Sequence, residues 1–305
     1  MANLKEVRIR IVSVNSTKQI TAAMKMVSAA KLRRAQDAIV RMRPYAEKLQ
    51  RILSNVSASL DGNEGTYSVQ REVKNVLLVA IVSNRGLAGA FNSQVFRSSI
   101  RKLVIEHEAQ GRIVHVLPLG KKAMDAYRRT KHFNPDLPTD GASLYDGLNF
   151  DKVVPKAELI MQLFANGTYD QVTLVYNKFR NAAVQVLAEE PYLPVAPPSA
   201  APSVVTSSAV ETEKQRGYKA DYIMEPDRAT IVQEIIPKSL KIQLYKALLD
   251  SNAAEHGARM TAMHKATDNA DSLLKDLKLS YNKARQAAIT NEILEIVGGA
   301  EALKG

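Results

Sequence analysis

The stretch LRRAQDAIVRMRPYAEKLQRIL, residues 32–53, decides the fold of this chain. Its apolar side chains recur at alternating steps of three and four residues, from Leu32 onwards to Leu60. That spacing places one apolar stripe along a helix and is the pattern of a coiled-coil seam. Because residues 1–60 contain no glycine and only one proline, Pro44, the sequence predicts one long helix over 1–60.

An earlier section of this helix has apolar residues at the same steps. They are Leu4, Val7, Ile11 and Val14. Between residues 14 and 32 the register of the seam is expected to slip, because Ile20, Met24 and Val27 form a separate short run. A slipped seam suggests that the partner surface changes along the helix.

The C-terminal part, residues 227–305, repeats the pattern. Its seam positions are Met260, Met263, Thr267, Ala270, Leu274, Leu277, Tyr281, Ala284 and Ala288. About 75 helical residues would extend roughly 110 Å, which is too long for a helix inside a compact domain of this size. Pro237 is expected to kink or interrupt the helix near its start, because proline lacks the amide hydrogen. Pairing the two terminal helices as an antiparallel coiled coil is the simplest way to bury both seams.

Between the terminal helices, the sequence alternates between strand and helix patterns. Strands are expected at 75–83, 112–120, 169–179 and 182–190, and helices at 91–111, 121–130 and 153–167. This order predicts a Rossmann-like α/β domain of the parallel type over 74–190. Residues 191–217 contain five prolines among Ala, Ser and Val, and are expected to form an exposed, flexible insertion. The predicted fold class is therefore α/β, with an antiparallel coiled coil made by the two chain ends.

Composition excludes several classes of function. The chain has 305 residues and no cysteine, which excludes disulfide frameworks, thiol catalysis and cysteine-based metal sites. The five histidines show no metal-binding spacing, so neither a metal nor a cofactor is predicted. No apolar run approaches the roughly 20 residues that span a bilayer, and the first residues do not have the pattern of a secretory signal. The net charge of +11, of which +9 lies within residues 1–60, indicates an acidic partner.

Two other functions compete for these features. The stretch SNRGLAGAFN, residues 83–92, follows a strand and precedes a helix, so Gly86 and Gly89 could let backbone amides approach a phosphate. It matches neither dinucleotide nor Walker patterns, and a tight strand-to-helix turn is the better account. A small Rossmann-like enzyme with helical arms stays as one alternative. A basic coiled-coil protein that binds nucleic acid is the other, although its basic helix lacks interleaved aromatic residues.

Three blocks of the sequence resemble the gamma subunits of F-type ATP synthases across nearly the whole chain. The first is IRIVSVNSTKQITAAMKMVSAAKLRRAQ at 9–36, with RPYAE at 43–47, and the second is SNRGLAGAFN. The third is ATDNADSLLKDLKLSYNKARQAAITNEILEIVGGA at 266–300. The resemblance implies a non-catalytic shaft inside a ring of three alpha and three beta subunits. Its foot would sit on a membrane ring of c subunits and hold the epsilon subunit.

The resemblance also implies which residues contact these partners. Arg285, Gln286, Thr290 and Glu292 would contact the beta subunits, as would Met24, Lys25, Arg33 and Arg34 lower on the shaft. Arg43, Pro44 and Tyr45, with Tyr222 and Glu225, would lie toward the c-ring and epsilon. The implied location is the cytoplasmic side of a bacterial inner membrane, with peripheral attachment. No nucleic acid is expected as a partner.

Overall fold

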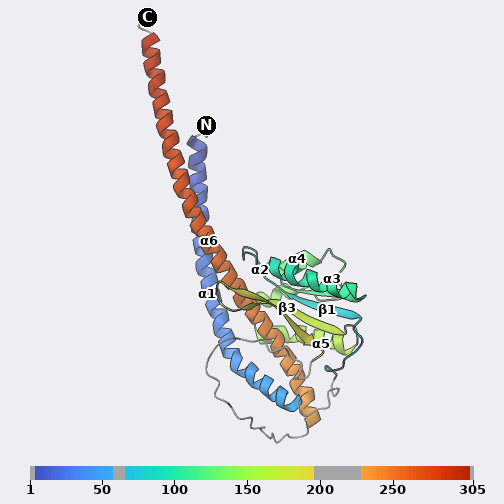
Figure 1. Cartoon of the computed structure of the whole chain (residues 1–305). Helices are drawn as coiled ribbons and strands as arrows, with labels where there is room; N and C mark the ends of the chain where they lie inside the picture. The colour runs from blue at the N-terminus through green and yellow to red at the C-terminus, as the bar shows by residue number, and fades with distance from the viewer. Residues whose placement is uncertain (1–3, 58–65, 196–227, 303–305) are drawn as a thin grey trace, which may run out of the picture.

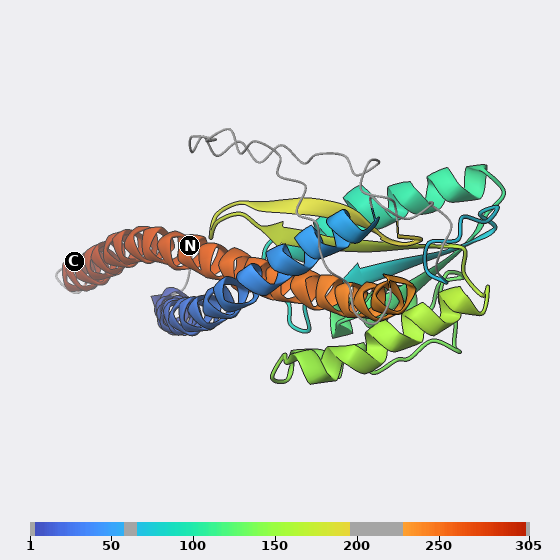
Figure 2. The same ribbon diagram turned by 90° about the horizontal axis from the view of Figure 1, so that it is seen from below.

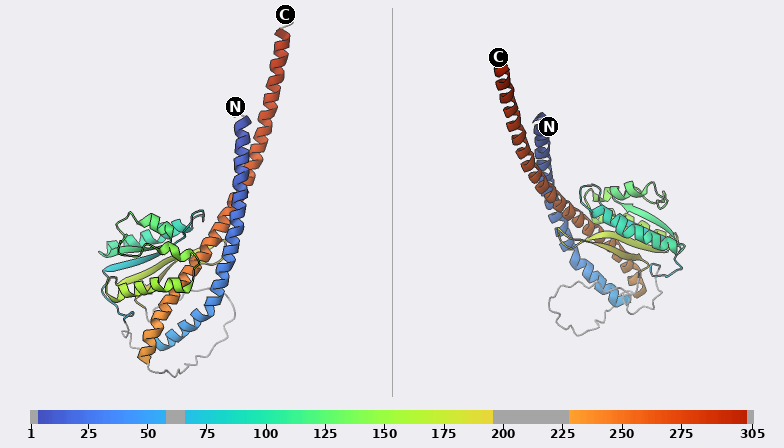
Figure 3. Two further views of the ribbon diagram at one scale, coloured as in Figure 1. Left: turned by 180° about the vertical axis from the view of Figure 1, so that it is seen from behind. Right: turned by 45° about the horizontal axis from the view of Figure 1, so that its top comes forward.

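The computed structural model describes residues 4–57, 66–195 and 228–302 of the chain. Its two long helices are α1 (Leu4–Ser57) and α6 (Arg228–Ala302). Both chain ends lie at the same end of the rod, so the helices run antiparallel, as expected (Figure 1). The α/β domain lies beside the other half of the rod, where α1 moves away from α6 (Figure 3).

The seam between α1 and α6 keeps one register through its middle section. One continuous set of half-buried and buried positions of α1 follows steps of three and four without a break: Val7, Ile11, Val14, Lys18, Thr21, Lys25, Ser28, Leu32, Ala35 and Ile39. The expected slip of register is therefore wrong. Ile20 and Val27, which suggested it, are 60% and 57% exposed on the outside of the rod.

At two levels of the seam, polar side chains of α1 and α6 contact each other, where the sequence pattern predicted apolar contacts. Lys18 Nζ lies 2.5 Å from Asp271 Oδ1, and the hydroxyl oxygens of Thr21 and Thr267 are 2.9 Å apart. A polar layer in a coiled coil specifies the register of its helices, at the expense of some stability. Continued toward the end of the rod, this pairing brings the first described residue, Leu4, opposite the region of Arg285. The last part of α6 therefore extends beyond α1, as Figure 1 shows.

The sheet has four strands in the order β2-β1-β3-β4. Its strands are β1 (Asn75–Ile81), β2 (Ile113–Leu119), β3 (Gln171–Phe179) and β4 (Gln185–Leu193). The first three are parallel, as predicted, whereas β4 pairs antiparallel with β3. Only residues 180–184 join β3 to β4, and a connection this short permits a hairpin but no parallel crossover. Strand β4 also continues beyond the expected end at residue 190, into the segment assigned to the insertion.

Shorter helices complete the domain. They are α2 (Phe91–Ser93), the π-helix η1 (Gln94–Ile100), α3 (Arg101–Ala109), α4 (Lys121–Tyr127), the 3-10 helix η2 (Gly141–Tyr145) and α5 (Phe150–Ala165). Successive residues of β1 face opposite sides of the sheet. Leu77 and Val79 pack with α5 and the first half of α6, while Leu78 packs with η1, α3 and α4. The sheet is therefore covered on both faces, as Figure 2 shows.

Pro237 lies within α6 and does not interrupt it. Proline cannot donate the amide hydrogen bond that the carbonyl group of Gln233 would otherwise accept. Because Gln233 is exposed, water can satisfy that carbonyl. The remainder of the expected insertion, residues 196–217, lies outside the described residues.

Candidate partner-contact surface

The end of α6 is the most exposed helical segment that the structure describes. Every described side chain from 291 to 300 is exposed. Five of the exposed residues are large and apolar: Ile289, Ile293, Leu294, Ile296 and Val297, each at least 47% exposed. A contiguous group of exposed apolar side chains marks an interaction surface more often than single ones do. This segment therefore has the character of a contact surface for another macromolecule.

The four residues predicted on this helix end lie on its accessible surface. Arg285, Gln286, Thr290 and Glu292 are all exposed. The Thr290 hydroxyl donates a hydrogen bond to the Gln286 carbonyl oxygen at 2.9 Å, which orients the threonine along its own helix. The guanidinium of Arg285, the amide of Gln286 and the carboxylate of Glu292 offer hydrogen-bonding groups beside an apolar surface.

The residues predicted lower on the shaft form a separate group. Met24 and Lys25 are half-buried, and Lys25 Nζ lies 3.4 Å from His264 Nδ1 of α6. At 1.5 Å per residue, the twenty or so residues from His264 to Arg285 place the two groups about 30 Å apart along the rod. One partner surface that contacts both groups must therefore be long.

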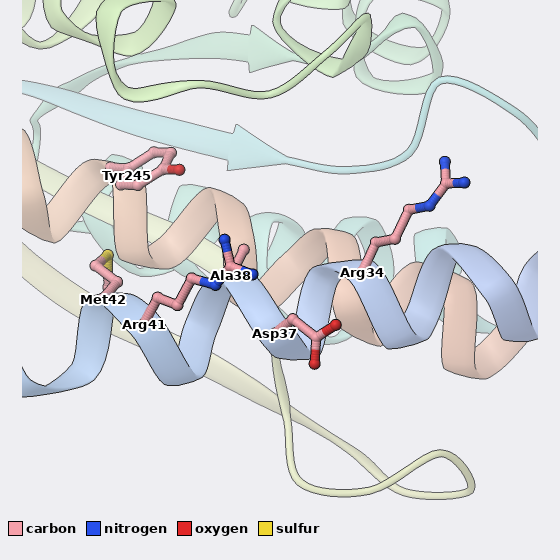
Figure 4. A pocket seen from close by; sticks show the side chains of 6 residues that line it. All are labelled: Arg34, Asp37, Ala38, Arg41, Met42 and Tyr245. Atoms are coloured by element: carbon pink, nitrogen blue, oxygen red, sulfur yellow. The ribbon is translucent and has the colours of Figure 1, made fainter.

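Arg33 and Arg34 are exposed on α1, and Arg34 lines a cavity of about 510 Å³. The lining residues come from α1 and α6 at the level where the two helices separate (Figure 4): Arg34, Asp37, Ala38, Arg41, Met42 and Tyr245. Two arginines and one aspartate leave this opening with a positive balance. The cavity is therefore suited to acidic side chains more than to basic ones.

The residues predicted near the foot are only partly described. Arg43, Pro44 and Tyr45 are exposed on the lower part of α1, with Tyr45 58% exposed. Tyr222 and Glu225 lie outside the described residues. The structure therefore brings Arg43 and Tyr45 to one accessible stretch of α1, and leaves their expected neighbours from 222–225 without a position.

No candidate metal site accompanies these surfaces in the part of the chain that the structure describes. Its residues contain no cluster of three or more His, Cys, Asp and Glu that could hold a metal ion. Among the same residues, no helix has the length and apolarity that crossing a membrane requires.

The place where open α/β sheets bind ligands is occupied by α6. In such sheets the crevice lies at the carboxyl ends of the strands, where the chain order reverses. Here that point lies between β1 and β3. The loops after these two strands contact α6, since the Arg85 carbonyl accepts a hydrogen bond from Arg259 and the Ala182 carbonyl accepts one from Thr261. Because α6 fills this crevice, the place where a nucleotide would bind is occupied by the chain itself, which argues against the nucleotide-binding alternative.

A buried charged pair that the sequence pattern did not predict lies at this crevice. Arg259 Nη2 lies 2.7 Å from Glu255 Oε1, and both side chains are 8% exposed. Burial raises the pKa of the Glu255 carboxyl, while the nearby Arg259 opposes this rise. The surrounding sequence, NAAEHGARMTAM at 252–263, gives one signal, because small residues around a charged pair indicate close packing.

Comparisons with known proteins agree with this arrangement. A family model described as "ATP synthase" matches residues 3–303. The chain is 52% identical over 306 residues to an ATP synthase gamma chain of Christiangramia forsetii. It is 54% identical over 310 residues to that of Flavobacterium johnsoniae. Each of these two alignments covers 100% of both proteins.

Solved structures share the fold at lower sequence identity. The rotor of the Euglena gracilis mitochondrial ATP synthase matches with a TM-score of 0.63 and 20% identity, covering 94% of this chain and 98% of that one. A central stalk and c-ring structure from Tetrahymena thermophila matches with a TM-score of 0.56 and 24% identity, covering 81% and 99%.

Proposed function

This chain belongs to the ATP synthase gamma-chain family, and from that premise we propose how it works as the central rotor shaft of the enzyme. It is a non-catalytic subunit. Its function is to couple rotation to changes of nucleotide affinity in the subunits that carry out ATP synthesis. The relatives named above give no support to the alternative of a nucleic-acid-binding protein.

One observation carries the mechanism: α6 continues beyond α1 as a single helix whose side chains are exposed. A helix with exposed Leu, Ile and Val residues is stable in water only if a partner covers it or if it belongs to a larger body. A surrounding ring of subunits provides such a cover. Within it the helix end can turn, because contacts of its exposed apolar side chains are not directional.

We assign the partners of each level of the shaft. Three alpha and three beta subunits surround the coiled coil, with beta contacting Arg285, Gln286, Thr290 and Glu292. Lower on the shaft, beta also contacts Met24, Lys25, Arg33 and Arg34. The foot, including Arg43 and Tyr45, meets the c-ring and the epsilon subunit, together with Tyr222 and Glu225. Exposed arginines on α1 suit acidic segments of these partners, which agrees with the net charge of the helix.

The asymmetry of the rod supports the mechanism. Where the two helices pair, one side of the shaft presents α1 and the other presents α6, and the two helices expose different residues; beyond α1 (Figure 1), the faces of α6 itself differ. Three chemically identical beta subunits would therefore meet three different faces at any moment. Turning the shaft moves each beta subunit through the same series of contacts, and differential contact free energy changes its nucleotide affinity.

The complex is attached to a membrane, and we propose the bacterial inner membrane, with this subunit on the cytoplasmic side. The two gamma chains that are 52% and 54% identical to this one come from bacteria, which supports this location. The subunit reaches the membrane through the c-ring, and none of its described helices needs to enter the bilayer.

The direct test is co-expression with the alpha and beta subunits of the same organism. Native mass spectrometry of the purified complex should give one copy of this chain for three alpha and three beta. Arg285→Ala/Gln286→Ala should lower ATP hydrolysis about tenfold, the factor expected when roughly 1.4 kcal/mol of contact free energy is lost. An unchanged rate would remove both residues from the beta contact.

The matched control is Gln94→Ala/Arg97→Ala, which changes the same two residue types at exposed positions of the π-helix η1. This variant should assemble and hydrolyse ATP at the rate of the unmodified complex. Failure of the unmodified chain to assemble with alpha and beta would overturn the proposed function itself.

A further inference from the structure

The loop after β1, residues 83–90, contacts α6 through the apolar Ala88 and through one charged side chain of the helix. Arg259 Nη2 donates to the Arg85 carbonyl oxygen at 3.0 Å, and Arg259 Nε donates to the Gly86 carbonyl oxygen at 3.3 Å. The same guanidinium contacts Glu255 Oε1 at 2.7 Å. One side chain of the shaft therefore binds two successive backbone carbonyls of the α/β domain.

The guanidinium of Arg259 is buried, so its partners are protein groups and not water. Its side chain is 8% exposed, so these protein contacts replace most of its hydration. The neighbouring His256 Nδ1 lies 3.3 Å from Arg259 Nη1. Burial, followed by the positive charges of Arg259 and Lys31, lowers the pKa of His256 to about 4. The imidazole is thus neutral near pH 7, and its Nδ1 can accept a hydrogen bond from the guanidinium.

The 83–90 loop has a shape that few sequences adopt. Leu87 has a φ of 62° and Gly89 a φ of 59°, both in the left-handed region. The start of the loop is held from within, since the Ser83 hydroxyl donates to the Arg85 carbonyl at 2.7 Å and the Asn92 side chain accepts from the Ser83 amide at 3.2 Å. This fixed geometry turns the Arg85 and Gly86 carbonyls toward α6.

A second contact joins the same part of α6 to the hairpin between β3 and β4. A Cβ atom placed on Gly257 would lie 3.2 Å from the Ala182 carbonyl oxygen, so only glycine lets the helix and hairpin approach this closely. The Thr261 hydroxyl also donates to that carbonyl at 3.0 Å. The first half of α6 packs into the core of the domain, and its Lys241 lies 2.6 Å from Glu158 of α5. At the carboxyl ends of the strands, two loops add to this contact, and Arg259 provides the charged side chain there.

We propose that Arg259 is a positioning residue that holds the 83–90 loop on α6, so that the α/β domain and the shaft turn as one body. This inference rests on the proposed rotor function. Torque that partners apply to the α/β domain reaches the coiled coil through the contacts of the domain with α6. A domain whose 83–90 end moves on α6 would transmit only part of that torque to the shaft.

The test uses the complete membrane complex carrying Arg259→Gln or Arg259→Lys. Glutamine removes the charge and cannot reach both carbonyls, whereas lysine keeps the charge and one donor. The control is Lys238→Gln, which removes a positive charge from the same helix. Lys238 likewise has an acidic partner four residues earlier, Glu234 at 3.3 Å, but both side chains are well exposed.

Two measurements read out the contact. Hydrogen exchange in the assembled complex follows the amides of Ser83 and Phe91, which are hydrogen-bonded within the loop region. In Arg259→Gln they should exchange about tenfold faster or more, because charge-assisted hydrogen bonds are lost. The second measurement is the number of protons pumped per ATP hydrolysed, which should fall to about half or less when torque is lost between domain and shaft.

The outcomes separate the inference from the rotor function. Support requires faster loop exchange and a lower pumping ratio in Arg259→Gln, recovery of both toward normal in Arg259→Lys, and no change in Lys238→Gln. A normal pumping ratio in an assembled Arg259→Gln complex overturns the inference and leaves the rotor function intact. Absence of the unmodified chain from the purified complex would instead contradict the rotor function.

Discussion

At the scale of single residues, α6 buries ionisable groups that the rest of the chain only partly compensates. Asp250 is 7% exposed. Burial raises the pKa of its carboxyl to about 6, against the opposing charges of Lys246, Lys178 and Arg43, while Glu190 raises it further. In the unfolded chain this carboxyl ionises near pH 4. Ionising Asp250 therefore lowers the free energy of unfolding once the pH exceeds about 4.

Replacing this carboxyl should stabilise the chain near neutral pH. An acid whose folded pKa is raised contributes full stability below its unfolded pKa and loses it as the pH rises toward the folded pKa. Asp250→Asn should therefore raise the free energy of unfolding at pH 7 by up to about 3 kcal/mol and have little effect at pH 4. Urea denaturation of the full chain at both pH values measures this.

Asp276→Asn provides the control for this experiment, because Asp276 is an exposed aspartate on the same helix. It should change the free energy of unfolding little at either pH. If Asp250→Asn destabilised the chain more at pH 7 than at pH 4, the ionised carboxylate would be a favourable partner of Lys246 or Lys178, contrary to the account.

Two glycines of α6 should respond in opposite ways to the same substitution. In Gly257→Ala the new methyl group meets the Ala182 backbone at 3.2–3.3 Å, so we expect a loss of about 1 kcal/mol after the gain in helix propensity is included. In Gly298→Ala nothing lies within 4 Å, and the propensity gain of up to about 1 kcal/mol should appear alone. Thermal unfolding measures both, and equal shifts would show that the hairpin does not press on α6.

At the scale of elements, the polar layer in the coiled coil aligns α1 with α6. Lys18 and Asp271 form an ion pair across the seam, with side chains 35% and 48% exposed. Thr21 and Thr267 meet directly beside it. Such contacts add little stability in the partly solvated seam, but they are lost when one helix slides past the other, and so they favour one register.

A charge swap tests this alignment. Lys18→Asp alone places two carboxylates together and should lower the free energy of unfolding by about 0.5–1 kcal/mol, less so in high salt. The double variant Lys18→Asp/Asp271→Lys should recover most of that loss, because the pair is restored with its signs exchanged. Recovery that is absent at low salt would mean that these positions do not face each other.

The elements differ in how far the sequence could predict them. Heptad steps identified both long helices, because apolar periodicity is a local signal. The register between residues 14 and 32 was mispredicted, since counting apolar residues favours Ile20 over Thr21. Only the partner helix, some 246 residues away, explains why a threonine is buried there. The antiparallel direction of β4 was predictable from its short connection to β3.

Among the residues of the candidate site, too, some were predictable from the sequence and others were not. Exposure of Arg285 and Gln286 agrees with their expected position on the shaft, and their contact with beta stays a prediction. The pair of Glu255 and Arg259 was missed because its acceptors, the carbonyls of Arg85 and Gly86, lie more than 170 residues away in sequence. Every residue has a backbone carbonyl, so the sequence does not show which carbonyl accepts a hydrogen bond.

At the scale of the whole molecule, the two ends of the rod have different surfaces. One end is a bare helix with exposed apolar side chains. The other end carries the α/β domain. Its sheet is covered on both faces, and one face packs against the first half of α6. A 75-residue helix extends about 110 Å, so one element links the two surfaces directly. That continuity suits a part that transmits rotation between distant partners.

The measurement that tests this account most directly is observation of rotation in single complexes. The chain has no cysteine, so Lys102→Cys on the exposed surface of α3 gives one labelling position. The labelled chain is assembled with alpha and beta subunits that are anchored to a surface, and ATP is added. The account predicts one-directional turning of the label with three resting positions per turn, one for each beta subunit. Steady ATP hydrolysis by the assembled complex with a label that does not turn would contradict it.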